Sequence, residues 1–267
     1  MTDDRPPTDQ PPSPSGPAAS PAGPSASDGP PIGAVSAIVG TFTQPGRTFE
    51  ALVRRPQWLL PLLLWVAVVF ASVFVATPKI DMERSMREIL EKRAARTGQE
   101  ISDQQIREIA ARQKSTGLRS GLVASAGFVV SFLVVGLLFW GGARAFGSEA
   151  RYPQVLAVWG HANLVNVVGG LLSLPVLASL PDASETQLSL GKAFKSNLGA
   201  FLPDTVPAAV GSLATSVDVF TIAALVLLVI GMRRLPALPR GAATAIPLVF
   251  WGLYVLAKAG LAAVFLG

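Results

Sequence analysis

The sequence predicts an all-helical, polytopic membrane protein: a bundle of five transmembrane helices with a hydrophilic helical insert after the first. Half of the 267 residues are hydrophobic, only 15% are charged, and the mean hydropathy is +0.47, as is typical of membrane proteins. Five stretches reach the roughly 20 mostly apolar residues that a spanning helix needs. They are Trp58–Ala76, Ser120–Ala143, Gln154–Leu180, Val210–Met232 and Ala243–Phe265. Backbone in lipid must pair its own polar groups, so each stretch should be helical.

The N-terminal segment, residues 1–33, is rich in Pro, Ser and Ala and is expected to be a disordered cytoplasmic tail. Ten of the first 31 residues are proline, and no apolar core of a signal peptide follows Met1. Such a segment buries too little apolar surface to offset its ordering entropy. The alternative is a docking segment in which paired prolines present a polyproline II surface to a partner.

Two short apolar stretches precede the first span. Ile32, Val35, Ile38 and Val39 recur at helical spacing, and a second helix is expected over residues 47–55, after a break at Pro45-Gly46. An apolar stripe with basic residues just before a span is typical of a helix lying on the membrane surface. The alternative is a helix packed on the ends of the spans.

The hydrophilic insert, about residues 79–119, is predicted to be a helical hairpin. It holds ten Lys or Arg and seven Asp or Glu residues. Asp81 can cap a first helix, which Thr97-Gly98 would end. Ser102 and Gln105 form a capping box for the second helix, with Ile101 and Ile106 as its hydrophobic staple. The charged face is either solvated or a surface for a protein partner.

The charges of the short loops predict the topology. Eight basic residues fall on one side: Arg47, Arg54, Arg55, Arg144, Arg151, Arg233, Arg234 and Arg240. The other side has only Lys192 and Lys195. Cytoplasmic loops carry the excess of Lys and Arg, so the N-terminus is expected in the cytoplasm and the C-terminus outside. The ten basic residues of the insert would then lie outside, which opposes the rule and leaves the side of the insert open.

Ionisable groups inside a membrane are costly and therefore mark candidate functional residues. Asp218 and Lys258 are expected at similar depth, roughly 10 Å below one surface at 1.5 Å per residue. They could form an ion pair between neighbouring helices. Alternatively, Lys258 extends to the surface and Asp218 bonds to neighbouring helices.

A second set of polar residues, His161, Asn163 and Asn166, lies in the third span. His161 could carry a proton or make an interhelical hydrogen bond. A lone histidine without neighbouring Cys, Asp or Glu is a poor metal site, and the chain has no cysteine. No phosphate-binding loop, dinucleotide fingerprint, zinc-protease motif or hydrolase motif is present. We therefore expect no catalytic residue, cofactor or metal, and no enzyme. With no basic face on a soluble module, we also expect no nucleic-acid partner.

Several short segments resemble the Yip family of Ypt/Rab-interacting membrane proteins, in its prokaryotic form. These segments are Phe42–Phe49, Pro56–Leu62, Val217–Ile222 and Ile230–Leu235. The likeness covers about residues 35–265, and its best parts are the Pro-x-x-Thr-Phe entry and the Asp-x-Phe start of the fourth span. The resemblance implies five spans in the inner membrane of a prokaryote, with a cytoplasmic N-terminus and an external C-terminus. Eukaryotic relatives act in vesicle trafficking with small GTPases, and the long charged insert differs from their compact loops.

Two functions are compatible with these features. The first is a non-enzymatic membrane scaffold or adaptor for proteins or lipid, with partners bound through the tail or the insert and possible self-association. The second is a small transporter or permease component that uses Asp218, Lys258 and His161.

Overall fold

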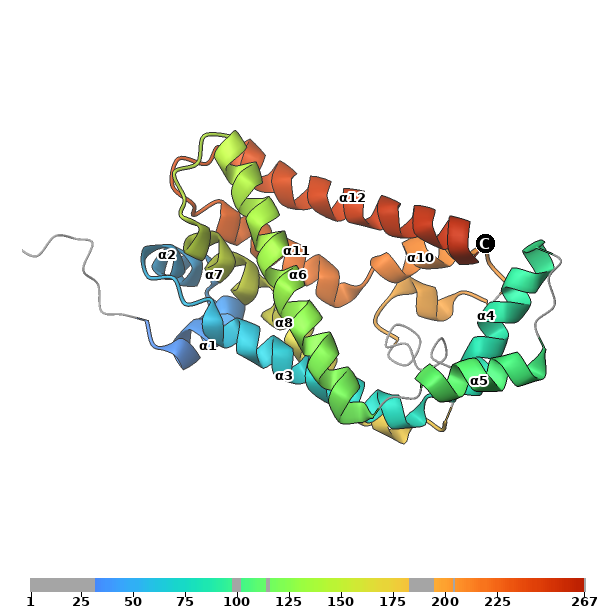
Figure 1. Ribbon diagram of the computed structural model, residues 1–267. Coiled ribbons are helices and arrows are strands. Elements are labelled where there is room, and N and C mark those ends of the chain that lie inside the picture. The colour runs from blue at the N-terminus through green and yellow to red at the C-terminus, as the bar shows by residue number, and fades with distance from the viewer. Residues whose placement is uncertain (1–31, 98–101, 114–115, 183–194, 204, 267) are drawn as a thin grey trace, which may run out of the picture. The chain divides into compact units, whose positions relative to one another are not determined.

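The computed structural model describes residues 32–97, 102–113, 116–182, 195–203 and 205–266 (Figure 1). These residues form helices, with four segments long and apolar enough to cross a membrane: Leu59–Lys79, Gly117–Ala145, Tyr152–Ser179 and Arg240–Val264. The expectation of an all-helical polytopic membrane protein is therefore met at this level. Of the predicted disordered tail, residues 1–33, all but the last two residues lie outside the described part of the chain.

Two short helices, α1 (Ala34–Thr43) and α2 (Pro45–Arg54), precede the first long helix and behave differently. α2 packs on α7 and α11 and buries Phe49, Leu52 and Val53 in the largest apolar core. α1 instead exposes Val35, Val39 and Phe42 along one side. Of the two alternatives, packing on the span ends describes α2, whereas the outward apolar face of α1 suits a lipid surface.

The long helices agree with the predicted spans except in the third and fourth stretches. The intact helices are α3 (Leu59–Ala76), continued by the 3-10 turn Thr77–Lys79, α6 (Gly117–Ala145) and α12 (Arg240–Leu266). The third stretch is divided at Asn163 into α7 (Tyr152–Ala162) and α8 (Leu164–Ser179). The fourth is divided at Val217 and Asp218 into α10 (Ala208–Ser216) and α11 (Val219–Met232). The prediction of one continuous fourth helix is therefore wrong.

Small residues bring these helices close together. A Cβ added at Gly231 of α11 would lie 2.5 Å from a methyl of Val158 and 3.0 Å from the ring of Phe49, so only glycine allows α11 to approach α7 and α2 this closely. At Gly170 of α8 the added atom would lie 2.4 Å from Val68 of α3. Both contacts join elements far apart in the sequence.

The insert contains α4 (Met82–Thr97) and α5 (Asp103–Gln113), which pack on each other. The Arg84 amide donates to Asp81 (3.0 Å), as the predicted cap requires. The predicted capping box is present in both directions: Gln105 N lies 3.3 Å from Ser102 Oγ, and Ser102 N lies 3.2 Å from Gln105 Oε1. The predicted helix end at Gly98 and staple residue Ile101 lie outside the described residues.

Candidate functional site

The break between α10 and α11 is built by hydrogen bonds from another part of the chain. Residues 196–198 run antiparallel to residues 217–219: the Leu198 amide donates to the Val217 carbonyl (3.1 Å), and the Val219 amide donates to the Ser196 carbonyl (3.2 Å). Backbone groups freed inside a membrane must find such partners. α11 has 14 residues and is about 21 Å long. It is therefore shorter than a hydrocarbon core, which is about 30 Å thick.

Asp218 is the N-cap of α11 and is not embedded in a continuous helix. Its Oδ1 accepts hydrogen bonds from the amides of Phe220 (2.9 Å) and Thr221 (3.1 Å). Its Oδ2 accepts a hydrogen bond from the Ser196 hydroxyl. A carboxylate at a helix N-terminus satisfies free amides and is stabilised by the helix dipole.

Lys258 of α12 does not pair with Asp218. Its ammonium donates to the hydroxyls of Thr215 (3.0 Å) and Ser216 (3.1 Å), in the last turn of α10. Among the residues with described side chains, no ion pair joins Lys258 to a carboxylate. The ion-pair alternative fails because the break supplies partners for both charges: amides and a hydroxyl for Asp218, and two hydroxyls for Lys258.

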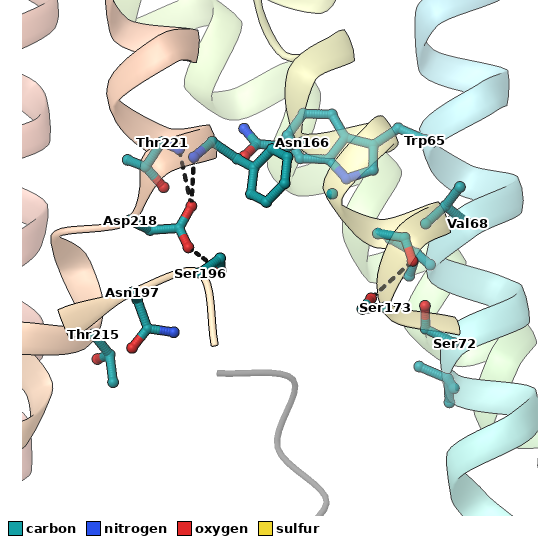
Figure 2. A pocket seen from close by; sticks show the side chains of 15 residues that line it. Trp65, Val68, Ser72, Asn166, Ser173, Ser196, Asn197, Thr215, Asp218 and Thr221 are labelled. Atoms are coloured by element: carbon teal, nitrogen blue, oxygen red, sulfur yellow. Dashed lines mark hydrogen bonds between the residues drawn. The ribbon is translucent and has the colours of Figure 1, made fainter. Parts of the chain in front are cut away.

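A cavity of about 370 Å³ lies beside the break (Figure 2). Trp65, Val68 and Ser72 of α3 and Asn166 and Ser173 of α8 line one wall, and Ser196, Asn197, Thr215, Asp218 and Thr221 line the other. Among the lining residues that the structure describes, Asp218 is the only one with a charged side chain. Phe220 closes the cavity where it meets Gly169, at which an added Cβ would lie 2.9 Å from the ring. The result is an open pocket with a mostly apolar lining, into which one carboxylate and several polar side chains are set.

The third-span residues organise the division between α7 and α8. His161 is buried, and its Nδ1 lies 3.0 Å from the Ala157 carbonyl. A carbonyl oxygen only accepts, so Nδ1 donates in this contact. Asn163 donates to the Trp159 carbonyl (2.9 Å) and accepts from Asn166 Nδ2 (2.9 Å). The Asn163 amide still donates to the Trp159 carbonyl (3.2 Å), and the Asn166 amide donates to the carbonyl only three residues earlier, that of Asn163 (3.0 Å), which marks the division.

The five candidate residues thus form two groups, and Asn166 connects the second group to the cavity. Asp218 and Lys258 are bound to opposite sides of the break, His161 and Asn163 belong to the α7–α8 division, and Asn166 joins that division to the cavity.

Asn166 and Thr221 also line a second, more apolar cavity of about 640 Å³. It lies among α6, α7, α8, α11 and α12, and its walls include Phe139, Trp159 and Phe250. The polar and apolar cavities are therefore neighbours that share two lining residues.

The sequence reasoning missed Ser72, Ser196, Thr215 and Ser216. A signal for the last two exists, because three of the four residues Thr215–Asp218 are polar, and Asp218 is an N-cap residue type inside an apolar stretch. Ser72 and Ser196 carry no such signal, because only the tertiary packing brings them to the break.

The fold and this site together define an integral membrane protein built from apolar helices, one of which is interrupted at an acidic cap. A model of the Yip1 domain matches residues 39–260, and the chain therefore belongs to the Yip1 domain family, as its sequence segments indicate. The chain is also similar to Membrane protein YknW of Bacillus subtilis (strain 168), with 20% identity over 220 residues, which cover 82% of this chain and 87% of that protein. This relative is bacterial. No solved structure matches the chain.

Proposed function

We propose that this Yip1-domain protein is a non-enzymatic membrane scaffold or adaptor, which binds its protein partner through the α4–α5 hairpin. The observation that carries the proposal is the construction of the hairpin. Ile106 and Ala110 of α5 and Ser85 of α4 are buried, and Arg87 is paired with Asp103 at 2.7 Å across the two helices. The hairpin therefore has its own small core and an ion pair that holds its two helices together.

The outer face of the hairpin is polar and charged. Gln104, Arg107, Glu108 and Arg112 are exposed on α5. α4 and α5 pack mainly on each other rather than on the long helices, so this face is available to another protein. Interfaces rich in charge give specificity and fast association more than affinity, which suits an adaptor.

The proposed membrane arrangement has five crossings, with α11 as the short fourth one. The N-terminus is cytoplasmic and the C-terminus external, in the inner membrane of a prokaryote. Support comes from the eight basic residues in the short loops of one side. The interior polar residues support a role without catalysis, because Asp218 caps α11 and His161 bonds to a carbonyl of its own helix.

A second candidate function is a small transporter or permease component. The specific observation in its favour is the interrupted helix beside a polar cavity. Discontinuous membrane helices form substrate sites in many transporters, with half-helix N-termini turned toward the bound group.

The adaptor function can be tested by site-specific photo-crosslinking of the full-length protein in intact membranes. A photoreactive residue at Gln104 or Glu108 should give a discrete heavier product. The same residue at Leu137, an exposed apolar position on α6, is the matched control and should crosslink to lipid alone. Arg107→Glu in the same chains should abolish the hairpin product. A hairpin pattern identical to that of Leu137 would refute the adaptor proposal.

A further inference from the structure

We propose that the cavity at the α10–α11 break binds the primary ammonium of an aminophospholipid headgroup, of the ethanolamine type, with part of an acyl chain in the neighbouring apolar cavity. This inference goes beyond the adaptor function and does not depend on it. Its support comes from an unpartnered buried hydroxyl, the charge of the cavity, its size and the adjoining apolar space.

The first observation is a buried polar group without a partner. Ser72 is only 7% exposed and lines the cavity, yet its hydroxyl makes no hydrogen bond to any residue that the structure describes. Figure 2 shows it on the α3 wall, across the cavity from Asp218. Its hydroxyl is accessible from the cavity, and lipid tails cannot pair with it. A polar ligand in the cavity would supply the missing partner.

The second observation concerns charge. A carboxylate has about four lone-pair sites, and three of those on Asp218 accept from Phe220, Thr221 and Ser196. One site remains for a donor from the cavity. Lys258 is not among the lining residues, because its ammonium is turned to the Thr215 and Ser216 hydroxyls on α10. Among the described residues, the charge that lines the cavity is therefore negative, which favours a cationic donor.

The acceptors near Asp218 suit an ammonium group with several N–H donors. Asn166 uses its Nδ2 on Asn163, which leaves its Oδ1 as an acceptor, and Thr221 adds a hydroxyl to the same region of the lining. Trp65 contributes an aromatic ring to the wall, and such rings attract cations. Ser72, across the cavity, can donate to an oxygen of the headgroup.

Size and surroundings select a lipid rather than a bare ion. A cavity of about 370 Å³ far exceeds the roughly 30 Å³ that one water occupies and falls within the range of small-molecule sites. It shares the lining residues Asn166 and Thr221 with the apolar cavity of about 640 Å³. An amphiphile with a polar head and an apolar chain fits this pair of cavities, and the bilayer supplies such molecules directly.

The test is competition between two lipids that differ only in the ammonium. Full-length protein in detergent is mixed with equimolar phosphatidylethanolamine and phosphatidylcholine with the same acyl chains, and bound lipid is counted by native mass spectrometry. Phosphatidylcholine keeps the charge, phosphate and chains but has no N–H donor. Because hydrogen bonds to charged groups contribute about 1.5–3 kcal/mol, we expect a preference of about tenfold or more for phosphatidylethanolamine.

Two variants assign the preference to this cavity. Asp218→Asn keeps an N-cap residue of nearly equal quality but removes the charge. The ratio of bound phosphatidylethanolamine to bound phosphatidylcholine should therefore fall toward one. Ser72→Ala should weaken the binding of both lipids alike, by about threefold, and leave the ratio of the two bound lipids unchanged. Glu149→Gln, an exposed acid outside the cavity, is the matched control and should behave as the parent chain.

An equal uptake of the two lipids by the parent chain, or a preference that persists in Asp218→Asn, would overturn the proposal. Displacement of the bound lipid by free ethanolamine at comparable concentration would overturn the role of the apolar cavity. Thermal unfolding followed by circular dichroism shows that each variant is folded. None of these readouts depends on crosslinking at the hairpin, so failure here is distinguishable from failure of the adaptor function.

Discussion

The capping of α11 by Asp218 leads to a quantitative prediction about stability. Asp218→Ala removes the acceptor of two backbone amides, at 2.9 and 3.1 Å, and the acceptor of the Ser196 hydroxyl. Loss of an N-cap costs about 0.5–2 kcal/mol, and loss of a hydrogen bond to a charged group costs about 1.5–3 kcal/mol. Taken together, these costs predict a loss of roughly 2–4 kcal/mol for Asp218→Ala.

The Asp218→Asn variant distinguishes the contribution of the N-cap hydrogen bonds to stability from that of the carboxylate charge. Asparagine caps helices about as well as aspartate, and its side-chain oxygen can accept from the same two amides. We therefore expect Asp218→Asn to recover about half or more of the stability that Asp218→Ala loses. Lys258 should not affect the difference in stability between these two variants, since it bonds to Thr215 and Ser216 and not to Asp218.

The assay is equilibrium unfolding of the purified full-length protein in detergent or bicelles, followed by far-UV circular dichroism. The free energies of unfolding of the parent, Asp218→Ala and Asp218→Asn are compared under one condition. Equal losses for the two variants would show that the charge, and not the cap, is what the fold requires. If Asp218→Ala had the same free energy of unfolding as the parent, Asp218 would not be the cap at which α11 begins.

Three further predictions follow from other contacts. Ser102→Ala should destabilise the helical hairpin by about 1 kcal/mol through loss of its capping box, and unchanged helix content and melting by circular dichroism would contradict this. Lys258→Met should be less harmful in a Thr215→Val background than alone, because the two partners are lost together, and strict additivity in a double-mutant cycle would exclude their hydrogen bond. Reporter fusions at Gly33 and after Gly267 should place the first in the cytoplasm and the second outside, and an external signal at Gly33 would refute the proposed topology.

Asp218 shows where sequence reasoning stopped short. Hydropathy joined residues 210–232 into one span because the average over the stretch is apolar and one Asp changes it little. The helix-start signal at residues 215–218 was present, but a helix break inside a membrane is stable only if other backbone pairs with it. Residues 196–198 supply that pairing, and no local pattern reveals that they do.

The sequence by itself determined the membrane class, the position of the apolar stretches and the caps at Asp81 and Ser102. Each of these depends on composition or on residues within one helical turn of each other. The tertiary structure alone decided the contact of Asp218 with Ser196, the partners of Lys258, the unpaired hydroxyl of Ser72 and the two cavities that share lining residues. These depend on helices separated by tens to more than a hundred residues, whose approach is set by packing at positions such as Gly169 and Gly170. Lipid satisfies no hydrogen bond, so polar side chains in the membrane bond to whichever groups that packing brings within reach.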